Sequence, residues 1–196
     1  MKGVIDLQIG VISDTHGSVY AWRKAYKEFL SHADLIIHAG DLLYHGARNP
    51  LPEEYNPRQL AEEINSSAVP IVIARGNCDS DVDQLVISRP IEAPYIHCYV
   101  DGLRILVHHG HLLSPDSLPP YINKDTCDIF ISGHTHVAGI STCSGVLCLN
   151  PGSPSLPKTE GAIPTIGWID GNAVKIIRLD TGSILEEHSA NFRRHA

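Results

Sequence analysis

Short apolar runs recur along this chain, and the segments between them constrain the fold most strongly. The first three runs lie at residues 7–13, 34–40 and 69–74, and a segment with helical periodicity separates each neighbouring pair. Strands that alternate with helices in this way favour parallel pairing. We therefore expect the first half of the chain to form a parallel sheet with helices packed on it.

Each of the two expected helices has a recognisable start and an apolar face. Ser18 is a candidate N-cap for a helix that extends to about residue 30. Proline in the pair Asn56-Pro57 suits the first turn of a second helix. The apolar positions are Val19, Trp22, Tyr26 and Phe29 in the first helix and Leu60, Ala61 and Ile64 in the second. Both faces are predicted to be buried against the sheet.

The second half of the chain contains shorter strands joined by tight turns. Asp101-Gly102 and Asp170-Gly171-Asn172 are turn signals between apolar runs. The expected strands cover residues 96–100, 103–109, 128–133, 139–143, 145–150, 165–170 and 173–179. Strands in this number are buried most simply in two layers. The predicted fold is α/β, with two stacked mixed β-sheets flanked by helices in a single domain over residues 1–196.

Composition narrows the class of protein. The 196 residues are 43% hydrophobic and 19% charged, which is typical of a globular domain, and the formal net charge is −7. Because no basic run is present, stable binding to nucleic acid is not expected. No apolar run approaches the ~20 residues that span a bilayer, so no membrane association is expected.

The cysteines and the amino-terminal residues indicate the cellular compartment. The five cysteines form no CxxC pair and no framework of a small secreted domain, so reduced thiols in the cytoplasm are the simplest interpretation. The amino-terminal stretch through Gly17 carries Asp6 within its apolar part and is interpreted as a first strand, not a signal peptide. For a homo-oligomer, a symmetric dimer is the default expectation, with the loop around Leu51 and residues 95–100 as candidate contacts.

Polar residues lie at the ends of five of the predicted strands. They are Asp14, His16, Asp41, Asn77, His109, His134 and His136. Ligands collect at the carboxyl ends of strands in parallel sheets. Two pairs, Asp14 with His16 and His134 with His136, are two residues apart, so in extended backbone each pair would point to one side. A glycine beside each cluster allows close approach of the backbone: Gly17, Gly40, Gly76, Gly110 and Gly133.

The donor types of these residues point to a metal site. Nitrogen and oxygen ligands suit manganese, iron or zinc better than copper(I). Seven ligands exceed one tetrahedral site and suit two divalent cations with one carboxylate between them. Each motif alone is weak, since DxH is common by chance and Asp41 or Asn77 alone is most simply a turn residue. The ordered set at successive strand ends favours a dinuclear metal centre.

In this order, DTH, GD, GN, HGH and GHTH resemble the motifs of the calcineurin-like metallophosphoesterase superfamily. The resemblance covers nearly the whole chain, and the longer strings GDLLYHGARN, RGNCDSDVDQ and NPGSPSLPK are similar to those of the bacterial YfcE-type phosphodiesterases. The resemblance implies an αββα sandwich of the metallophosphoesterase type and two metals, often manganese. By position, Asp14, His16 and His136 would hold one metal, Asn77, His109 and His134 the other, and Asp41 would bridge. His109 is preferred to His108 because it directly precedes Gly110.

The implied activity is a metal-dependent phosphodiesterase that hydrolyses a small phosphodiester with a metal-bridging hydroxide. In many superfamily members a histidine, thought to protonate the leaving alkoxide, follows the asparagine; here Cys78 follows Asn77. A thiol with an ordinary pKa near ~8.5 can donate a proton, so Cys78 is the candidate catalytic acid. Equally, Cys78 could be a small residue that only fills space beside the site. We expect a preference for substrates with good leaving groups, or help from His111 or a metal-bound water.

Two other functions stay open. One is a phosphomonoesterase or nucleotidase that uses the same site. The other is a binding scaffold with little or no catalysis, like a eukaryotic retromer subunit of similar fold. Competent ligands at all seven positions favour an enzyme, whereas Cys78 is the feature that leans toward the scaffold.

Several further residues have weaker signals. Residues 44–55 form a proline-rich loop, expected at the rim of a site, where Arg48 and Asn49 could contact phosphate but are more simply solvated. Asn150 and Ser153 could support the site, although a Pro-Gly turn is the simpler interpretation. Asp79, Asp81 and Asp83 are expected to be turn and cap residues, with Val82 and Leu85 starting an apolar contact. No site role is expected for His32, His97, His188 and His195, the last two in a polar tail.

Overall fold

The computed structural model describes residues 7–189 and residue 192. In chain order the elements are β1 (Gln8–Ile12), α1 (Val19–Glu28), the 3₁₀ turn η1 (Leu30–His32), β2 (Leu35–His38), α2 (Pro57–Asn65), β3 (Ile71–Ala74), α3 (Asp83–Val86), β4 (Ile91–Glu92), β5 (Ile96–Val100), β6 (Leu103–Val107), the 3₁₀ turn η2 (Pro115–Ser117), β7 (Ile129–Ile131), β8 (Gly139–Cys143), β9 (Val146–Asn150), β10 (Thr165–Asp170), β11 (Ala173–Arg178) and β12 (Ile184–Ser189). No helix among the described residues is long and apolar enough to cross a membrane.

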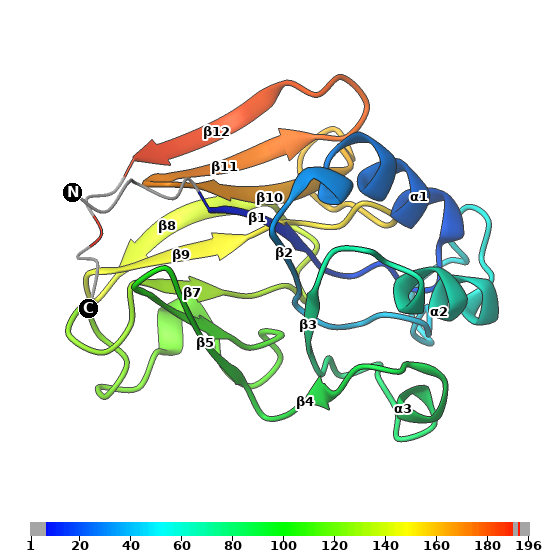
Figure 1. The fold of residues 1–196 in the computed structure, drawn as a ribbon, viewed down its shortest axis with the longest axis horizontal. Helices are drawn as coiled ribbons and strands as arrows, with labels where there is room; N and C mark the ends of the chain where they lie inside the picture. Colours follow the sequence, from blue (N-terminus) through cyan, green and yellow to red (C-terminus); the bar gives the residue numbers. More distant parts are fainter. Residues whose placement is uncertain (1–6, 190–191, 193–196) are drawn as a thin grey trace.

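The strands form two mixed sheets, as predicted (Figure 1). The seven-stranded sheet has the order β12-β11-β10-β1-β2-β3-β4, and the five-stranded sheet has the order β5-β6-β7-β9-β8. Strands β1 to β4 pair in parallel, whereas β10 to β12 add to β1 in antiparallel fashion. The carboxyl ends of β1, β2 and β3 therefore share one edge of the sheet, where the polar clusters follow.

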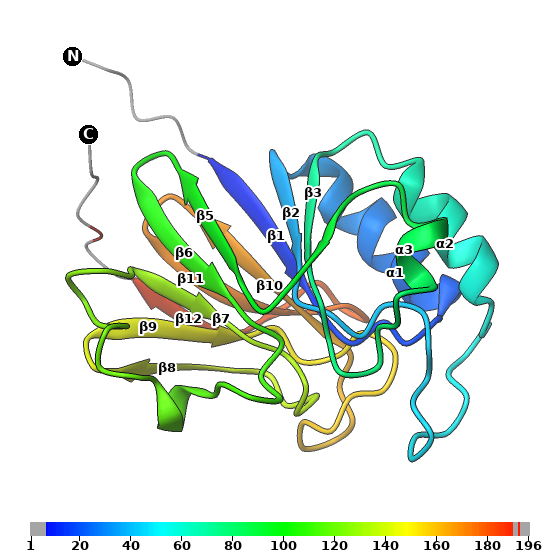
Figure 2. The ribbon, with the colours of Figure 1, turned by 90° about the horizontal axis from the view of Figure 1, so that it is seen from below.

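Three apolar layers hold the sheets and helices together. Helices α1 and α2 cover one face of the seven-stranded sheet, and the five-stranded sheet covers the other (Figure 2). Trp22 and Leu60 belong to the helix layer, and Val11 and Val107 belong to the layer between the sheets. The outer face of the five-stranded sheet packs against the segment that contains η2 and Ile122. In the described part of the chain, this segment takes the place of a flanking α-helix.

Both predicted helix starts are confirmed. Ser18 Oγ accepts a hydrogen bond from the Ala21 N–H (3.1 Å), and Asn56 Oδ1 accepts one from the Gln59 N–H (3.1 Å). These side chains satisfy N–H groups that have no partner within the first turn of a helix. The predicted apolar faces lie inward, with Trp22 buried on α1.

Elements at the periphery differ from expectation. The segment expected to be a polar tail forms β12, and His188 lies opposite Val174 of β11. All six residues of β12 are exposed, so the strand has no apolar alternation that the sequence could reveal. His195 lies outside the described residues. The apolar contact expected of Val82 and Leu85 is wrong, since they are 65% and 82% exposed.

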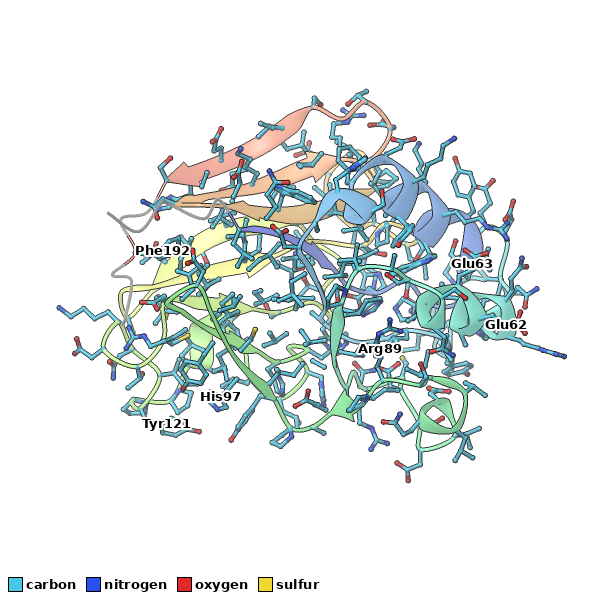
Figure 3. All side chains as sticks on the ribbon, in the orientation of Figure 1. Glu62, Glu63, Arg89, His97, Tyr121 and Phe192 are labelled. Carbon is cyan, nitrogen blue, oxygen red and sulfur yellow. The ribbon has the colours of Figure 1, made fainter. Side chains whose placement is uncertain are left out.

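Arg89, labelled in Figure 3, fastens the carboxyl end of α2. Its guanidinium donates to the carbonyl oxygens of Ile64 (2.9 Å), Asn65 (3.3 Å) and Ser67 (3.2 Å). The last carbonyls of a helix lack partners within the helix and lie at the negative end of its dipole. A cation at this place therefore stabilises the helix end and joins it to the segment before β4.

Replacing Arg89 with alanine is predicted to lower the free energy of unfolding by about 1–2 kcal/mol, because three carbonyls lose a charged donor. Urea denaturation of the wild type and the variant measures the difference. Arg58→Ala is the matched control, since the Arg58 side chain is 91% exposed and pairs with Glu62 on the surface of α2. Equal losses in the two variants would contradict the assigned role of Arg89.

Candidate metal centre

The loops after β1 and β2 remain hydrogen-bonded to each other beyond the ends of the strands. The N–H groups of residues 14, 16 and 17 donate to the carbonyls of residues 40, 41 and 42, at 3.0, 3.1 and 2.7 Å. A third loop is joined by the buried carboxylate of Asp79. It accepts from the N–H groups of Asp41 (2.8 Å), Leu42 (2.7 Å) and Gly76 (2.7 Å). Asp79 is therefore a turn residue, as predicted, that also connects the loops after β2 and β3.

Five of the seven predicted ligands adopt left-handed backbone conformations. Their φ angles are 56° at Asp14, 47° at His16, 56° at Asp41, 69° at His134 and 59° at His136. Such values are uncommon for residues other than glycine and cluster at functional sites. The expectation that extended backbone aligns the DxH and HxH pairs is wrong, because sharp turns direct these side chains.

Close approach of backbone explains two of the neighbouring glycines. A Cβ on Gly76 would collide with the Asp41 carboxylate, and a Cβ on Gly133 would collide with the side chain of Ser13 and lie 2.6 Å from Asp14 Oδ2. Any larger residue at either position would displace a predicted ligand.

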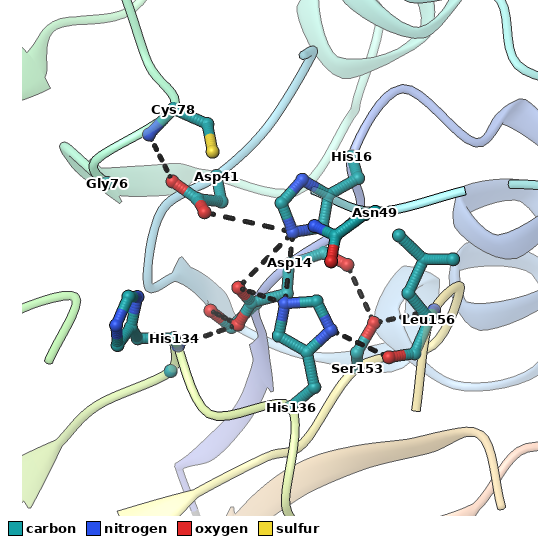
Figure 4. Close-up of polar contacts among 12 residues, drawn as sticks. Asp14, His16, Asp41, Asn49, Gly76, Cys78, His134, His136, Ser153 and Leu156 are labelled. Atoms are coloured by element: carbon teal, nitrogen blue, oxygen red, sulfur yellow. Dashed lines mark hydrogen bonds and ion pairs between the residues drawn. The ribbon is translucent and has the colours of Figure 1, made fainter. Parts of the chain in front are cut away.

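The first group of predicted ligands is Asp14, His16 and His136 (Figure 4). His136 Nε2 lies 3.2 Å from Asp14 Oδ1 and 3.1 Å from His16 Nε2. His16 Nε2 lies 3.6 Å from the same Asp14 oxygen. All three residues are buried, so three donor atoms from two distant segments meet at one point away from solvent.

The second group is Asp14, Asp41 and His109. His109 Nε2 lies 3.2 Å from Asp41 Oδ2 and 3.9 Å from Asp14 Oδ1. The same Asp41 oxygen is 3.7 Å from His16 Nε2 in the first group. One carboxylate oxygen thus lies between the imidazoles of both groups, which is the position expected of a shared ligand.

Backbone carbonyls orient all three of these imidazoles. The Nδ1 atoms of His16, His109 and His136 lie 2.8, 2.8 and 2.7 Å from the carbonyl oxygens of Tyr44, Ala39 and Leu156. Because a carbonyl oxygen only accepts, each Nδ1 carries a hydrogen and each Nε2 faces the centre. This is the arrangement that fixes histidine ligands in metal sites.

The buried charges favour a cation at the centre. Asp14 Oδ1 and His109 Nε2 are buried and, within the described residues, have no partner in hydrogen-bonding geometry. Burial alone would lower the pKa of His109, but the Asp41 and Asp14 carboxylates outweigh it and raise the pKa to about 9. Burial would raise the pKa of Asp14, yet the imidazoles of His136 and His16 lower it overall. A divalent cation fits this donor set, because it would satisfy both carboxylates and the facing Nε2 atoms.

His134 and Asn77 lie at the edge of these groups. The His134 N–H donates to Asp14 Oδ2 (3.0 Å), and its ring is 5.3 Å from that of His109. Asn77 is exposed, and its amide nitrogen donates to Cys78 Sγ (3.3 Å). Both residues line a hollow of about 470 Å³ over the centre, together with Asp41 and His136. The structure thus brings all seven predicted ligands to one region, with five at its buried base.

Cys78 lies directly beside Asp41. Its N–H donates to Asp41 Oδ1 (2.8 Å), and its thiol lies close to Asp41 and His16. Burial and the negative charge of Asp41 raise the pKa of the Cys78 thiol to about 12. The expectation of an ordinary thiol pKa is therefore wrong, and Cys78 stays protonated at neutral pH.

Some of the remaining candidates line the hollow over the centre, and others support the centre from behind. The hollow is lined at its rim by residues 46–50, which include Arg48, and by Lys158, which the sequence reasoning missed. Ser153, together with Ser155, donates to the Asp14 carbonyl oxygen at 2.8 and 2.9 Å. These two contacts join residues that are 139 and 141 positions apart in the sequence, so no local pattern could reveal them.

Two further polar predictions concern neighbours of the centre. Asn150 Nδ2 donates to the Gly133 carbonyl (2.9 Å) and to Thr135 Oγ1 (3.0 Å), which holds the loop that carries His134. His108, which was not chosen as a ligand, is buried, and its ring stacks on that of His111 with 5.1 Å between the ring centroids. His111 Nδ1 is buried without a hydrogen-bond partner in the described part of the chain.

Comparisons with known proteins identify the family of the chain. The family model described as the calcineurin-like phosphoesterase superfamily domain matches residues 7–171. The chain is 37% identical over 180 residues to phosphodiesterase YfcE of Escherichia coli K12, covering 91% of this chain and 96% of that protein. It is 28% identical to phosphodiesterase MJ0936 of Methanocaldococcus jannaschii, covering 84% and 93%.

Solved structures show the same fold. The structure of YfcE, a phosphoesterase from E. coli, superimposes with a TM-score of 0.87 at 35% identity and covers 94% of this chain and all of that one. Vacuolar Protein Sorting 29 of Cryptosporidium parvum shares the fold with a TM-score of 0.68 at 20% identity, covering 94% and 99%. The chain belongs to the calcineurin-like phosphoesterase superfamily. It is a metallophosphoesterase, a hydrolase that acts on phosphoric esters.

Replacing Asp41 with asparagine is predicted to lower bound metal and turnover together. Loss of a hydrogen-bond partner behind a metal ligand lowers affinity or activity by ~10–100-fold, so loss of the carboxylate that lies between the two groups should lower turnover by more than about 100-fold. Elemental analysis after dialysis and a phosphoester assay measure the two effects. Asp81→Asn is the control, because the Asp81 side chain is 93% exposed. Full metal content and rate in the Asp41 variant would refute the shared role.

Proposed function

We propose that this chain is a metal-dependent phosphodiesterase with a dinuclear metal centre. The observation that carries the proposal is the pair of overlapping buried groups that share Asp14 and approach each other through Asp41. Two relatives across most of the chain bear the name phosphodiesterase, which supports the diester as substrate. A small phosphodiester suits a hollow of about 470 Å³, since small-molecule sites typically measure ~300–1,000 Å³.

Each predicted ligand has a place in this proposal. Asp14, His16 and His136 hold one divalent cation, and Asn77, His109 and His134 hold the other. Asp41 is shared, because its carboxylate lies between the imidazoles of His16 and His109. Manganese is the first choice, and iron and zinc accept the same nitrogen and oxygen donors. When bound, such cations supply Lewis-acid activation of water and of the phosphoryl group.

The chain's own residues bind and orient the ester. Arg48 and Lys158 line the hollow over the centre from two different loops, and their charges suit the phosphoryl oxygens. Cys78 is proposed as the residue beside the leaving oxygen, where a protonated thiol can donate its hydrogen. Its pKa of about 12 makes it a weak acid that gives little protonation, so turnover should favour good leaving groups, which need little.

We also propose that the protein works in the cytoplasm and binds neither membranes nor nucleic acid. All five cysteines lie in the described residues and none is in a disulfide bond, which suits a reducing compartment. The formal net charge of −7 opposes a grip on the phosphate backbone of nucleic acids. A symmetric homo-oligomer is part of the same proposal.

Metal-stripped protein is expected to hydrolyse bis(p-nitrophenyl) phosphate only after manganese is added. Turnover of this diester should exceed that of p-nitrophenyl phosphate by about tenfold or more, if the centre is shaped for diesters. Initial rates during a manganese titration measure both. Faster turnover of the monoester would instead support a phosphomonoesterase or nucleotidase. Bound metal without turnover of either ester would support a scaffold.

Replacing Cys78 with histidine is predicted to raise turnover of diesters with poor leaving groups. An imidazole has an ordinary pKa near ~6.5 and is a stronger acid than this buried thiol. Rates over a series of alkyl and aryl diesters give the dependence on leaving-group pKa, which should flatten in the variant. A slope equal to that of the wild type would place Cys78 outside the proton transfer.

A further inference from the structure

A second hollow, of about 430 Å³, lies against the hollow over the metal centre. Cys78 lines both. The apolar and aromatic side chains of the second hollow belong to Leu43, Tyr44, Tyr55, Pro57 and Val86. We call this set, with Cys78 at its shared wall, the tyrosine pocket. Its volume lies within the ~300–1,000 Å³ of small-molecule sites.

Small residues stand at the boundary between the two hollows. Gly46, which lines the metal-centre hollow, lies so close to Cys78 that an added Cβ would be 3.2 Å from the thiol sulfur. Gly46 also has a φ angle of 78°, which side chains rarely adopt. Glycine and a thiol therefore keep this boundary thin, and a group held over the metal centre lies next to the tyrosine pocket.

The walls of the tyrosine pocket are suited to an aromatic ring. The His45 ring makes edge contacts with the rings of both Tyr44 and Tyr55. The ring centroids are 4.7 and 5.2 Å apart and the interplanar angles are 66° and 84°, so the three rings hold one another in place. Aromatic rings favour offset-stacked or edge-to-face contact with a further ring. Tyr44 is nevertheless 43% exposed and Val86 is 49% exposed, so apolar surface remains for a ligand to cover.

The two charged side chains of the pocket already have partners. The Arg58 side chain pairs with Glu62 (3.2 Å), and Asp83 Oδ2 accepts from the Ser80 N–H (2.9 Å). A charged ligand would compete with these contacts. An apolar, planar group would leave them intact.

We propose that the tyrosine pocket binds an aromatic ring carried by one alcohol of the phosphodiester substrate. This inference rests on the proposed function, since it takes the phosphoryl group to lie over the metal centre. It narrows the substrate class to diesters of an aromatic alcohol or of an alcohol that carries an aromatic base. Specificity then comes from residues of the loop after β2 and of α3, which lie outside the predicted ligand set.

Phosphonates test the pocket without turnover, because their P–C bond resists hydrolysis. Calorimetric titration of manganese-loaded protein with phenylphosphonate and methylphosphonate compares a ligand that has the ring with one that lacks it. The phenyl compound is expected to bind the wild type about tenfold more tightly. Val86→Asp should remove most of that difference while leaving the affinity for methylphosphonate unchanged.

Leu85→Asp is the matched control, since Leu85 lies on the same helix but is 82% exposed and does not line the pocket. It should keep the tenfold preference. Equal affinities of the two phosphonates for the wild type, or equal losses in the Val86 and Leu85 variants, would overturn the tyrosine pocket. Failure of both phosphonates to bind would overturn the phosphoryl site and the pocket with it. Phenyl preference without diester turnover would refute the proposed function alone.

Discussion

The backbone hydrogen bonds between residues 14–17 and 40–42 are the constraint on which the metal centre depends. They extend the pairing of β1 with β2 past the ends of both strands, and the Asp79 carboxylate then holds the loop after β3 against them. Loops joined in this way can maintain left-handed φ angles at Asp14, His16 and Asp41, which isolated turns would relax. The strain is local, whereas the structure that opposes it includes three strands and two helices. Convergence of the ligands is therefore a property of the whole sheet edge.

Most of the fold and the location of the site follow from local patterns in the sequence. Alternating strands and helices, with Ser18 and Asn56 as caps, lead to the parallel sheet, and polar residues at strand ends lead to the site. The direction of the side chains does not follow, because left-handed conformation at histidine has no sequence signal. Asp79 likewise looks like an ordinary turn residue. Its carboxylate accepts hydrogen bonds from the N–H groups of Asp41 and Leu42, which lie 38 and 37 residues away in the sequence. Only the folded chain brings these groups together.

The elements that sequence reasoning missed share a physical cause. α3 has four residues, β4 has two, and β12 is exposed along its length, so none buries a periodic apolar face. β12 is stabilised instead by its ladder to β11 and by a hydrogen bond from the Ile140 N–H to Glu186 (3.1 Å). That bond connects the edges of the two sheets. Pairing with β11 thus stabilises a strand that local propensity alone would not predict. The acidic residues of this edge strand also oppose its pairing with other chains.

Position 78 serves both proton donation and the narrow boundary between the two hollows, and these two requirements favour different side chains. A stronger proton donor there would need a larger side chain, and an imidazole would occupy the boundary that Gly46 and the thiol keep thin. The thiol, with its pKa raised to about 12, contributes little acidity but leaves room beside the metal centre. Such an arrangement suits a substrate whose leaving group needs little protonation. Aryl alcohols meet that condition, because a phenol ionises near pH ~10, far below an alkyl alcohol. If the tyrosine pocket holds the departing alcohol, the ring that provides binding also provides the good leaving group, and the weak acid at position 78 is sufficient.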